Sequence, residues 1–88
     1  MVDKVQYEGV VSVFFFNVVD HGQVLVDPEG GEHADLPAAM AEAMDCVREL
    51  VIQSIRSDRR LGLDRSMRIA DEHGQDLTEF KFAEAFEQ

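Results

Sequence analysis

The stretch that most constrains this chain is residues 10–19, a run of β-branched and aromatic side chains that predicts a strand. His21-Gly22 follows it, and because glycine adopts positive φ at no steric cost, we expect a two-residue hairpin turn there. This turn pairs Val19 with Val24 and Val18 with Leu25, which places Leu25 on the inner face of the hairpin. It also starts a second strand that ends at the turn-forming residues 27–31. The start of the chain therefore predicts an antiparallel hairpin.

A helix is predicted after this hairpin. Asp35 is a suitable N-cap, and Pro37 is tolerated in a first helical turn. Apolar residues then recur with the spacing of one helix face, at Leu36, Met40, Ala43, Met44, Val47, Leu50, Val51 and Ile55. We expect the helix to weaken near Ser57 and to have ended by Gly62.

A second hairpin is predicted from residues 66–71 and 76–82, with its turn at residues 72–75. The register that places Asp71 opposite Asp76 also pairs Met67 with Phe80. The predicted inner face then holds Met67, Ile69, Phe80 and Phe82. Residues 83–88 are expected to form a short turn, with Phe86 packing back on the core.

These elements define an α+β fold in the order β-β-α-β-β, an antiparallel sheet of two hairpins with one helix packed on one face. The 88 residues allow one domain, which we assign to residues 10–86. Residues 1–9 are interpreted as an N-terminal extension, either a possible extra edge strand or a frayed arm.

Several motifs resemble those of a family of small bacterial proteins that carry an uncharacterised domain of unknown function. The resemblance covers residues 12–86. Its motifs are Phe15-Phe16-Asn17-Val18-Val19-Asp20-His21-Gly22, Asp27-Pro28-Glu29-Gly30, Asp35-Leu36 with Ala39 and Ala43, and Met67-Arg68-Ile69-Ala70-Asp71-Glu72-His73-Gly74 with Leu77 and Phe82. The resemblance supports the element boundaries and implies no reaction.

The charge balance excludes some partners. Eight Lys and Arg against 18 Asp and Glu give a net charge of −10, which opposes binding to nucleic acid or to an anionic membrane. The single cysteine, Cys46, has no partner for an internal disulfide, and we see no signal peptide or membrane-spanning run. A cytoplasmic location follows by elimination. No motif predicts a cofactor.

Two clusters of charged residues offer candidate sites. Carboxylates and a histidine in the loops of the first hairpin are candidate ligands for a divalent cation: Asp20, Asp27, Glu29 and His33. The simpler interpretation is that they form turns. Five arginines form a candidate patch for an anionic partner: Arg56, Arg59, Arg60, Arg65 and Arg68. Their alternative role is to complement the dipole at the end of the helix.

The first hairpin is apolar on both faces, whereas one helix covers only one of them. The outer face holds a candidate interface formed by Val11, Val13, Phe15, Val19, Val24 and Val26. Monomeric proteins rarely expose so large an apolar patch, so we expect a second copy, or one of the chain's own termini, to cover it.

We therefore expect a non-enzymatic binding or regulatory module that acts as a homodimer, with another protein as the remaining kind of partner. No local signature of a catalytic site is present. The alternative function is a small-ligand or divalent-metal-binding protein that uses the acidic hairpin loops.

Overall fold

The computed structural model describes residues 11–87, so the expectation for residues 1–9 lies outside the described part of the chain. The elements in chain order are β1 (Ser12–Asp20), β2 (Gln23–Leu25), β3 (Gly31–His33), α1 (Leu36–Asp58), β4 (Ser66–Ala70), β5 (Asp76–Lys81) and the 3-10 helix η2 (Phe82–Phe86). The predicted α+β class, with one helix between two hairpins, is confirmed. The short strand β3 was not predicted.

All pairings in the five-stranded sheet are antiparallel, and β1 lies at its centre. On one side, β1 pairs with β2 near its end and with β3 near its start; on the other side it pairs with β4, which pairs with β5. The predicted pairs Val19 with Val24 and Met67 with Phe80 are confirmed. β1 therefore joins strands that lie far apart in the sequence into one sheet.

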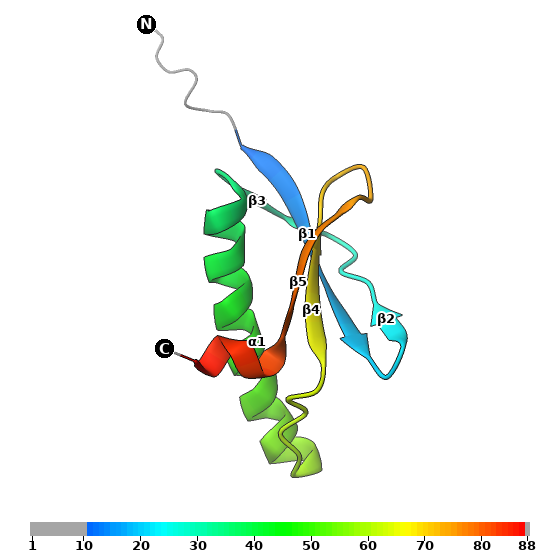
Figure 1. Ribbon diagram of the computed structural model, residues 1–88, viewed down its shortest axis with the longest axis vertical. Helices are drawn as coiled ribbons and strands as arrows, with labels where there is room; N and C mark the ends of the chain where they lie inside the picture. Colours follow the sequence, from blue (N-terminus) through cyan, green and yellow to red (C-terminus); the bar gives the residue numbers. More distant parts are fainter. Residues whose placement is uncertain (1–10, 88) are drawn as a thin grey trace, which may run out of the picture.

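The core lies between α1 and one face of the sheet, as Figure 1 shows. Asp35 caps the helix by accepting a hydrogen bond from the Ala38 backbone N–H at 2.9 Å, as predicted. The helix buries every fourth residue, namely Ala39, Ala43, Val47 and Val51. Two of these are alanines, whose small side chains allow the helix backbone to approach the sheet closely, and Phe14 and Ile69 belong to the same buried core.

The edge next to β1 is interrupted between β2 and β3. The Asp27 backbone N–H donates to Asn17 Oδ1 at 2.9 Å, and the Phe16 N–H donates to Asp27 Oδ2 at 3.2 Å. These two side-chain bonds replace the missing ladder bonds. The prediction of a glycine-rich loop through residue 31 was therefore wrong at its end, because the chain rejoins β1 at Gly31.

Three local predictions from the sequence were wrong. Leu25 was placed on the inner face but is 58% exposed, because β2 is an edge strand next to β1. Asp76 pairs with Ala70 rather than Asp71, because the register shifts between Ile69 and Ala70. Phe86 does not pack back and is 48% exposed, whereas Phe82 and Ala85 of η2 are buried.

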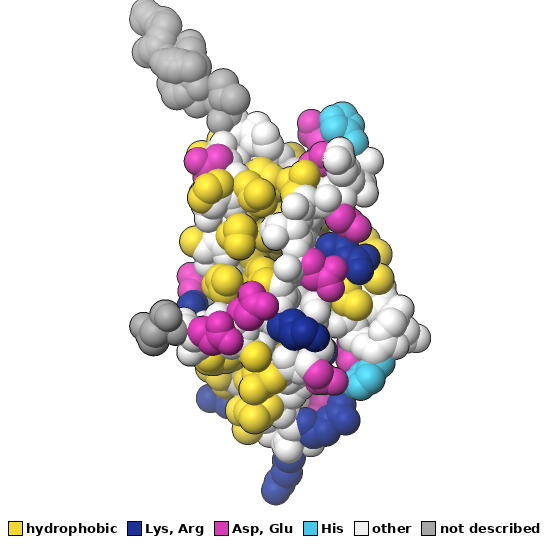
Figure 2. Space-filling view, viewed as in Figure 1, with side chains coloured by type: hydrophobic (Ala, Val, Ile, Leu, Met, Phe, Trp, Pro, Cys, Tyr) yellow, Lys and Arg dark blue, Asp and Glu magenta, His cyan; other side chains and the backbone are white. Residues whose placement is uncertain are grey.

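Charged side chains of both signs are spread over the face seen in Figure 2. Lys and Arg occupy the lower end, where α1 ends, and also lie at mid-height among Asp and Glu, and further Asp and Glu lie at the upper right near the β4–β5 turn. In the part of the chain that the structure describes, no helix is both long and apolar enough to cross a membrane.

Candidate binding sites

The four candidate metal ligands do not converge. Asp20 Oδ1 lies 2.7 Å from His21 Nδ1, whereas Asp27 is bonded to backbone groups of its own loop and of β1. Glu29 is exposed, and His33 lies against aromatic rings of β1. Within residues 11–87, no group of three or more His, Cys, Asp and Glu side chains is arranged to hold a metal ion.

Asp27 instead organises its loop. Its carboxylate accepts hydrogen bonds from the backbone N–H groups of Phe16, Glu29 and Gly30 at 3.1–3.2 Å. Burial alone raises the pKa of this carboxyl, but the three backbone donors outweigh it and leave the pKa below its ordinary value. Asp27 is therefore a charged structural residue at neutral pH.

His33 has an aromatic environment. Its ring centroid lies 5.9 Å from that of Phe14 and 5.5 Å from that of Phe16. Its Nδ1 atom is buried and has no hydrogen-bond partner among the described residues. These contacts fit an imidazole that packs as part of the core.

The five-arginine patch separates into three environments. Arg65 turns inward: its guanidinium bonds to Ser54 Oγ at 2.8 Å and lies 4.6 Å from the centre of the Phe82 ring. Arg68 lies on the sheet and pairs with Glu79 at 3.0 Å. Arg56, Arg59 and Arg60, at the end of α1, make neither an ion pair nor a side-chain hydrogen bond within residues 11–87. The patch is thus smaller than the sequence indicated.

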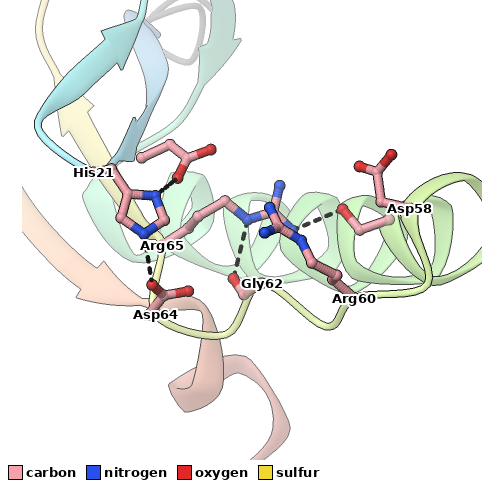
Figure 3. A pocket seen from close by; sticks show the side chains of 8 residues that line it. His21, Asp58, Arg60, Gly62, Asp64 and Arg65 are labelled. Atoms are coloured by element: carbon pink, nitrogen blue, oxygen red, sulfur yellow. Dashed lines mark hydrogen bonds and ion pairs between the residues drawn. The ribbon is translucent and has the colours of Figure 1, made fainter.

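A polar pocket of about 230 Å³ lies beside this helix end. Figure 3 shows His21 between two carboxylates, with Nδ1 2.7 Å from Asp20 and Nε2 3.4 Å from Asp64. Arg65 Nε donates to the Gly62 carbonyl at 3.0 Å, and Gly62 has a positive φ of 64°. A side chain at Gly62 would collide with the Arg65 guanidinium.

The polar pocket therefore connects parts of the fold. His21 links the β1–β2 turn to Asp64 in the α1–β4 connection, and Arg65 links that connection to Ser54 of α1. These polar groups satisfy one another, so the pocket fits a structural role better than a catalytic one.

A second hollow, of about 380 Å³, lies on the sheet face opposite α1. Its floor contains Phe15 and Asn17 of β1 and Ala70 of β4. One wall is the loop of Val26, Asp27 and Pro28, and the other wall is formed by Asp71, Glu72, Gly74 and Asp76 around the β4–β5 turn. We call this hollow the acidic groove. Sequence reasoning missed it because its two walls come from loops more than 40 residues apart.

The predicted interface on the outer face is partly covered by the chain itself. A Cβ atom on Gly30 would lie 2.8 Å from Phe15 Cε2 and 2.9 Å from Val13 Cγ1, so the Gly30 backbone packs directly on both side chains. Val13, Phe15 and Val19 are accordingly half-buried, whereas Val11, Val24 and Val26 are exposed. The cover comes from an internal loop, which the sequence analysis did not consider.

Cys46 has the environment of a packing residue. Burial raises the pKa of its thiol, and the negative charges of Glu42, Asp45 and Asp27 raise it further. The thiol stays protonated at neutral pH, which opposes a nucleophilic role.

The fold and these surfaces define a small α+β protein in which one helix covers one face of an antiparallel sheet. The chain belongs to the family described as Domain of unknown function (DUF6894), which it matches over residues 13–83. No curated protein and no solved structure matches the chain.

Proposed function

We propose that this protein is a non-enzymatic binding module that works as a homodimer. The observation that carries the proposal is a run of three consecutive exposed apolar residues at the edge of the sheet, the first two in β2 and the third directly after it: Val24 (41% exposed), Leu25 (58%) and Val26 (69%). We call it the β2 strip. Val24 and Val26 belong to the interface expected from the sequence.

The β2 strip has two properties of a self-association surface. Its side chains are apolar, so their removal from water favours association. Within residues 11–87, β2 also pairs with β1 alone, which leaves its other edge open to another strand. An antiparallel pair of β2 strands uses both properties under one two-fold axis.

The small size of the β2 strip predicts a weak dimer. Stable interfaces bury about 1,200 Å² or more in total, and two three-residue strips supply only part of that area. We therefore expect a dissociation constant on the order of micromolar, so that the average mass rises with concentration.

Light scattering after gel filtration, at several concentrations, tests the proposal. Wild type is expected to approach twice the chain mass, and Leu25→Asp is expected to remain a monomer because each copy would bury an unpaired carboxylate. Ile52→Asp is the matched control, since Ile52 is also apolar and 43% exposed but lies on α1.

The control variant is expected to dimerise like wild type. A wild-type mass that stays at one chain at every concentration contradicts the dimer, and equal loss in both variants contradicts the β2 strip as its location.

A further inference from the structure

The acidic groove combines a floor that is apolar except for Asn17 with charged walls. Phe15 and Ala70 lie on the floor, and the Gly30 backbone already packs against the phenyl ring at one side. A volume of about 380 Å³ is enough to accept side chains of another molecule. Val26 belongs both to a wall of the groove and to the β2 strip, whereas Leu25, the residue changed to test the proposed dimer, does not line the groove.

Four carboxylates stand on the walls: Asp27, Asp71, Glu72 and Asp76. Asp71 is held in place, because its Oδ1 accepts from the backbone N–H groups of His73 and Gln75, both at 2.9 Å. The backbone bonds to Asp27 hold the opposite wall. A cation entering the groove therefore meets oriented negative charge on both sides.

The positive charge within the described structure does not balance these walls. Arg68, on the adjacent part of the sheet, lies 3.7 Å from Asp76 Oδ2 but is closer to Glu79, at 3.0 Å. The remaining wall carboxylates make no ion pair with Lys or Arg among residues 11–87. The groove is thus complementary to a partner that supplies cations.

We infer that the acidic groove docks a basic segment of another protein, in which Arg or Lys stands next to an apolar residue. The apolar side chain packs on Phe15 and Ala70, and the cation lies between the two acidic walls. An adjacent guanidinium also gains from the face of an aromatic ring. A second copy fits less well, because it brings a further net charge of −10.

Two synthetic probes test both halves of this inference. One is a fluorescein-labelled Arg-Leu-Arg-Leu-Arg peptide, and the other is the matched Arg-Ser-Arg-Ser-Arg peptide. Fluorescence anisotropy on the full chain is expected to show at least tenfold tighter binding of the leucine peptide, because only its apolar side chains can use the floor of the groove.

The variant for the walls is Glu72→Gln/Asp76→Asn. It removes two wall charges and spares Asp27 and Asp71, which hold backbone turns. The control is Glu42→Gln/Glu49→Gln on α1, which removes the same charge from exposed positions of the helix. The wall variant is expected to weaken binding of the leucine peptide about tenfold, and the control variant less than about twofold.

Three outcomes overturn the inference. Equal weakening by the two variants means that only the overall negative charge attracts the peptide. Equal binding of the two peptides means that the apolar floor is unused. If the wall variant instead changes the mass measured by light scattering, the groove is occupied by a second copy. Leu25→Asp is expected to lose the dimer but to bind the leucine peptide as wild type does. The dimer proposal and the groove proposal can therefore fail separately.

Discussion

Two hairpin turns of this protein contain the same tripeptide, His-Gly-Gln, and they close in different ways. In the first turn both His21 (φ 51°) and Gly22 (φ 83°) have positive φ, which is the conformation of a tight two-residue hairpin. In the second turn Gly74 (φ 82°) has positive φ, while His73 does not. There Glu72 stands between Asp71 and His73, whereas Asp20 directly precedes His21.

This single additional residue changes the role of the aspartate. Asp20 Oδ1 lies 2.7 Å from Nδ1 of the exposed His21 ring, which is a side-chain hydrogen bond at the surface. Asp71 instead accepts from two backbone N–H groups and holds a wider turn. The wider turn also places Glu72 and Gly74 beside the acidic groove. Turn length, rather than the shared tripeptide, determines what each hairpin end can do.

The largest expected effect is that of Gly30→Ala in the loop of the first hairpin. The new methyl group would meet Phe15, Val13 and the Phe14 carbonyl within 3.1 Å, at a residue with φ 72°. We expect a loss of about 3 kcal/mol in unfolding free energy, measured by urea denaturation. Gly74→Ala is the control in the second hairpin: its φ is similar, but no atom lies within 4 Å, so about 1 kcal/mol is expected. Equal losses of unfolding free energy in the two variants would contradict close packing of the Gly30 backbone against Phe15 and Val13.

The next largest effect is a difference in the loss of stability between variants of Asp71 and Asp20. Asp71→Ala removes an acceptor of two backbone hydrogen bonds and is expected to cost about 1–2 kcal/mol. Asp20→Ala removes a contact with His21, whose side chain is 72% exposed, and a loss of less than about 0.5 kcal/mol is expected. Thermal unfolding of both variants tests this order. A loss for Asp20→Ala equal to that for Asp71→Ala would contradict the different roles.

The smallest effect concerns Asp27 and depends on pH. The pKa of its carboxyl in the folded protein is below its ordinary value of 3.8, so the ionised form stabilises the fold above that pH. This stabilisation is lost as pH falls through the lower, folded pKa. Asp27→Asn is expected to cost about 1 kcal/mol at pH 7, because one acceptor oxygen becomes a donor.

Urea denaturation across the acid range measures this dependence. The difference between wild type and Asp27→Asn should shrink as the pH is lowered below 3.8. Glu42→Gln, on the exposed side of α1, serves as the control and is expected to change stability by less than about 0.5 kcal/mol at pH 7. A difference that does not vary with pH would contradict the role of the Asp27 charge.

Features encoded by neighbouring residues could be predicted from the sequence. The His21-Gly22 turn, the Asp35 cap and the pairing of Met67 with Phe80 all follow from local patterns, and all three are confirmed. The predicted end of the helix near Ser57 was also close to the observed one, because α1 stops at Asp58 and Arg59 adopts φ 60°. Alternation and capping depend on a few adjacent residues, so they are visible without the tertiary structure.

Features that depend on distant contacts were missed. The return of the chain at Gly31 requires Asp27 to bond to Phe16, which lies 11 residues before it in the chain. Leu25 is exposed because β2 lies at the edge of the sheet. The acidic groove forms only where two loops meet across β1 and β4. Of the four predicted metal ligands, Asp27 alone lines the acidic groove, and Phe15 and Val26 of the predicted interface line it as well.

The central position of β1 has a consequence for synthesis of the chain. β1 leaves the ribosome before α1, which covers its inner face, and before β4, which begins at Ser66 and completes its pairing. Until then, residues 13–19 form a nascent segment with high β-propensity, without proline or charge. Asp20 is the first charged residue after this segment and acts as a gatekeeper against aggregation. A translational pause between α1 and β4 would prolong this exposure and increase the need for a chaperone.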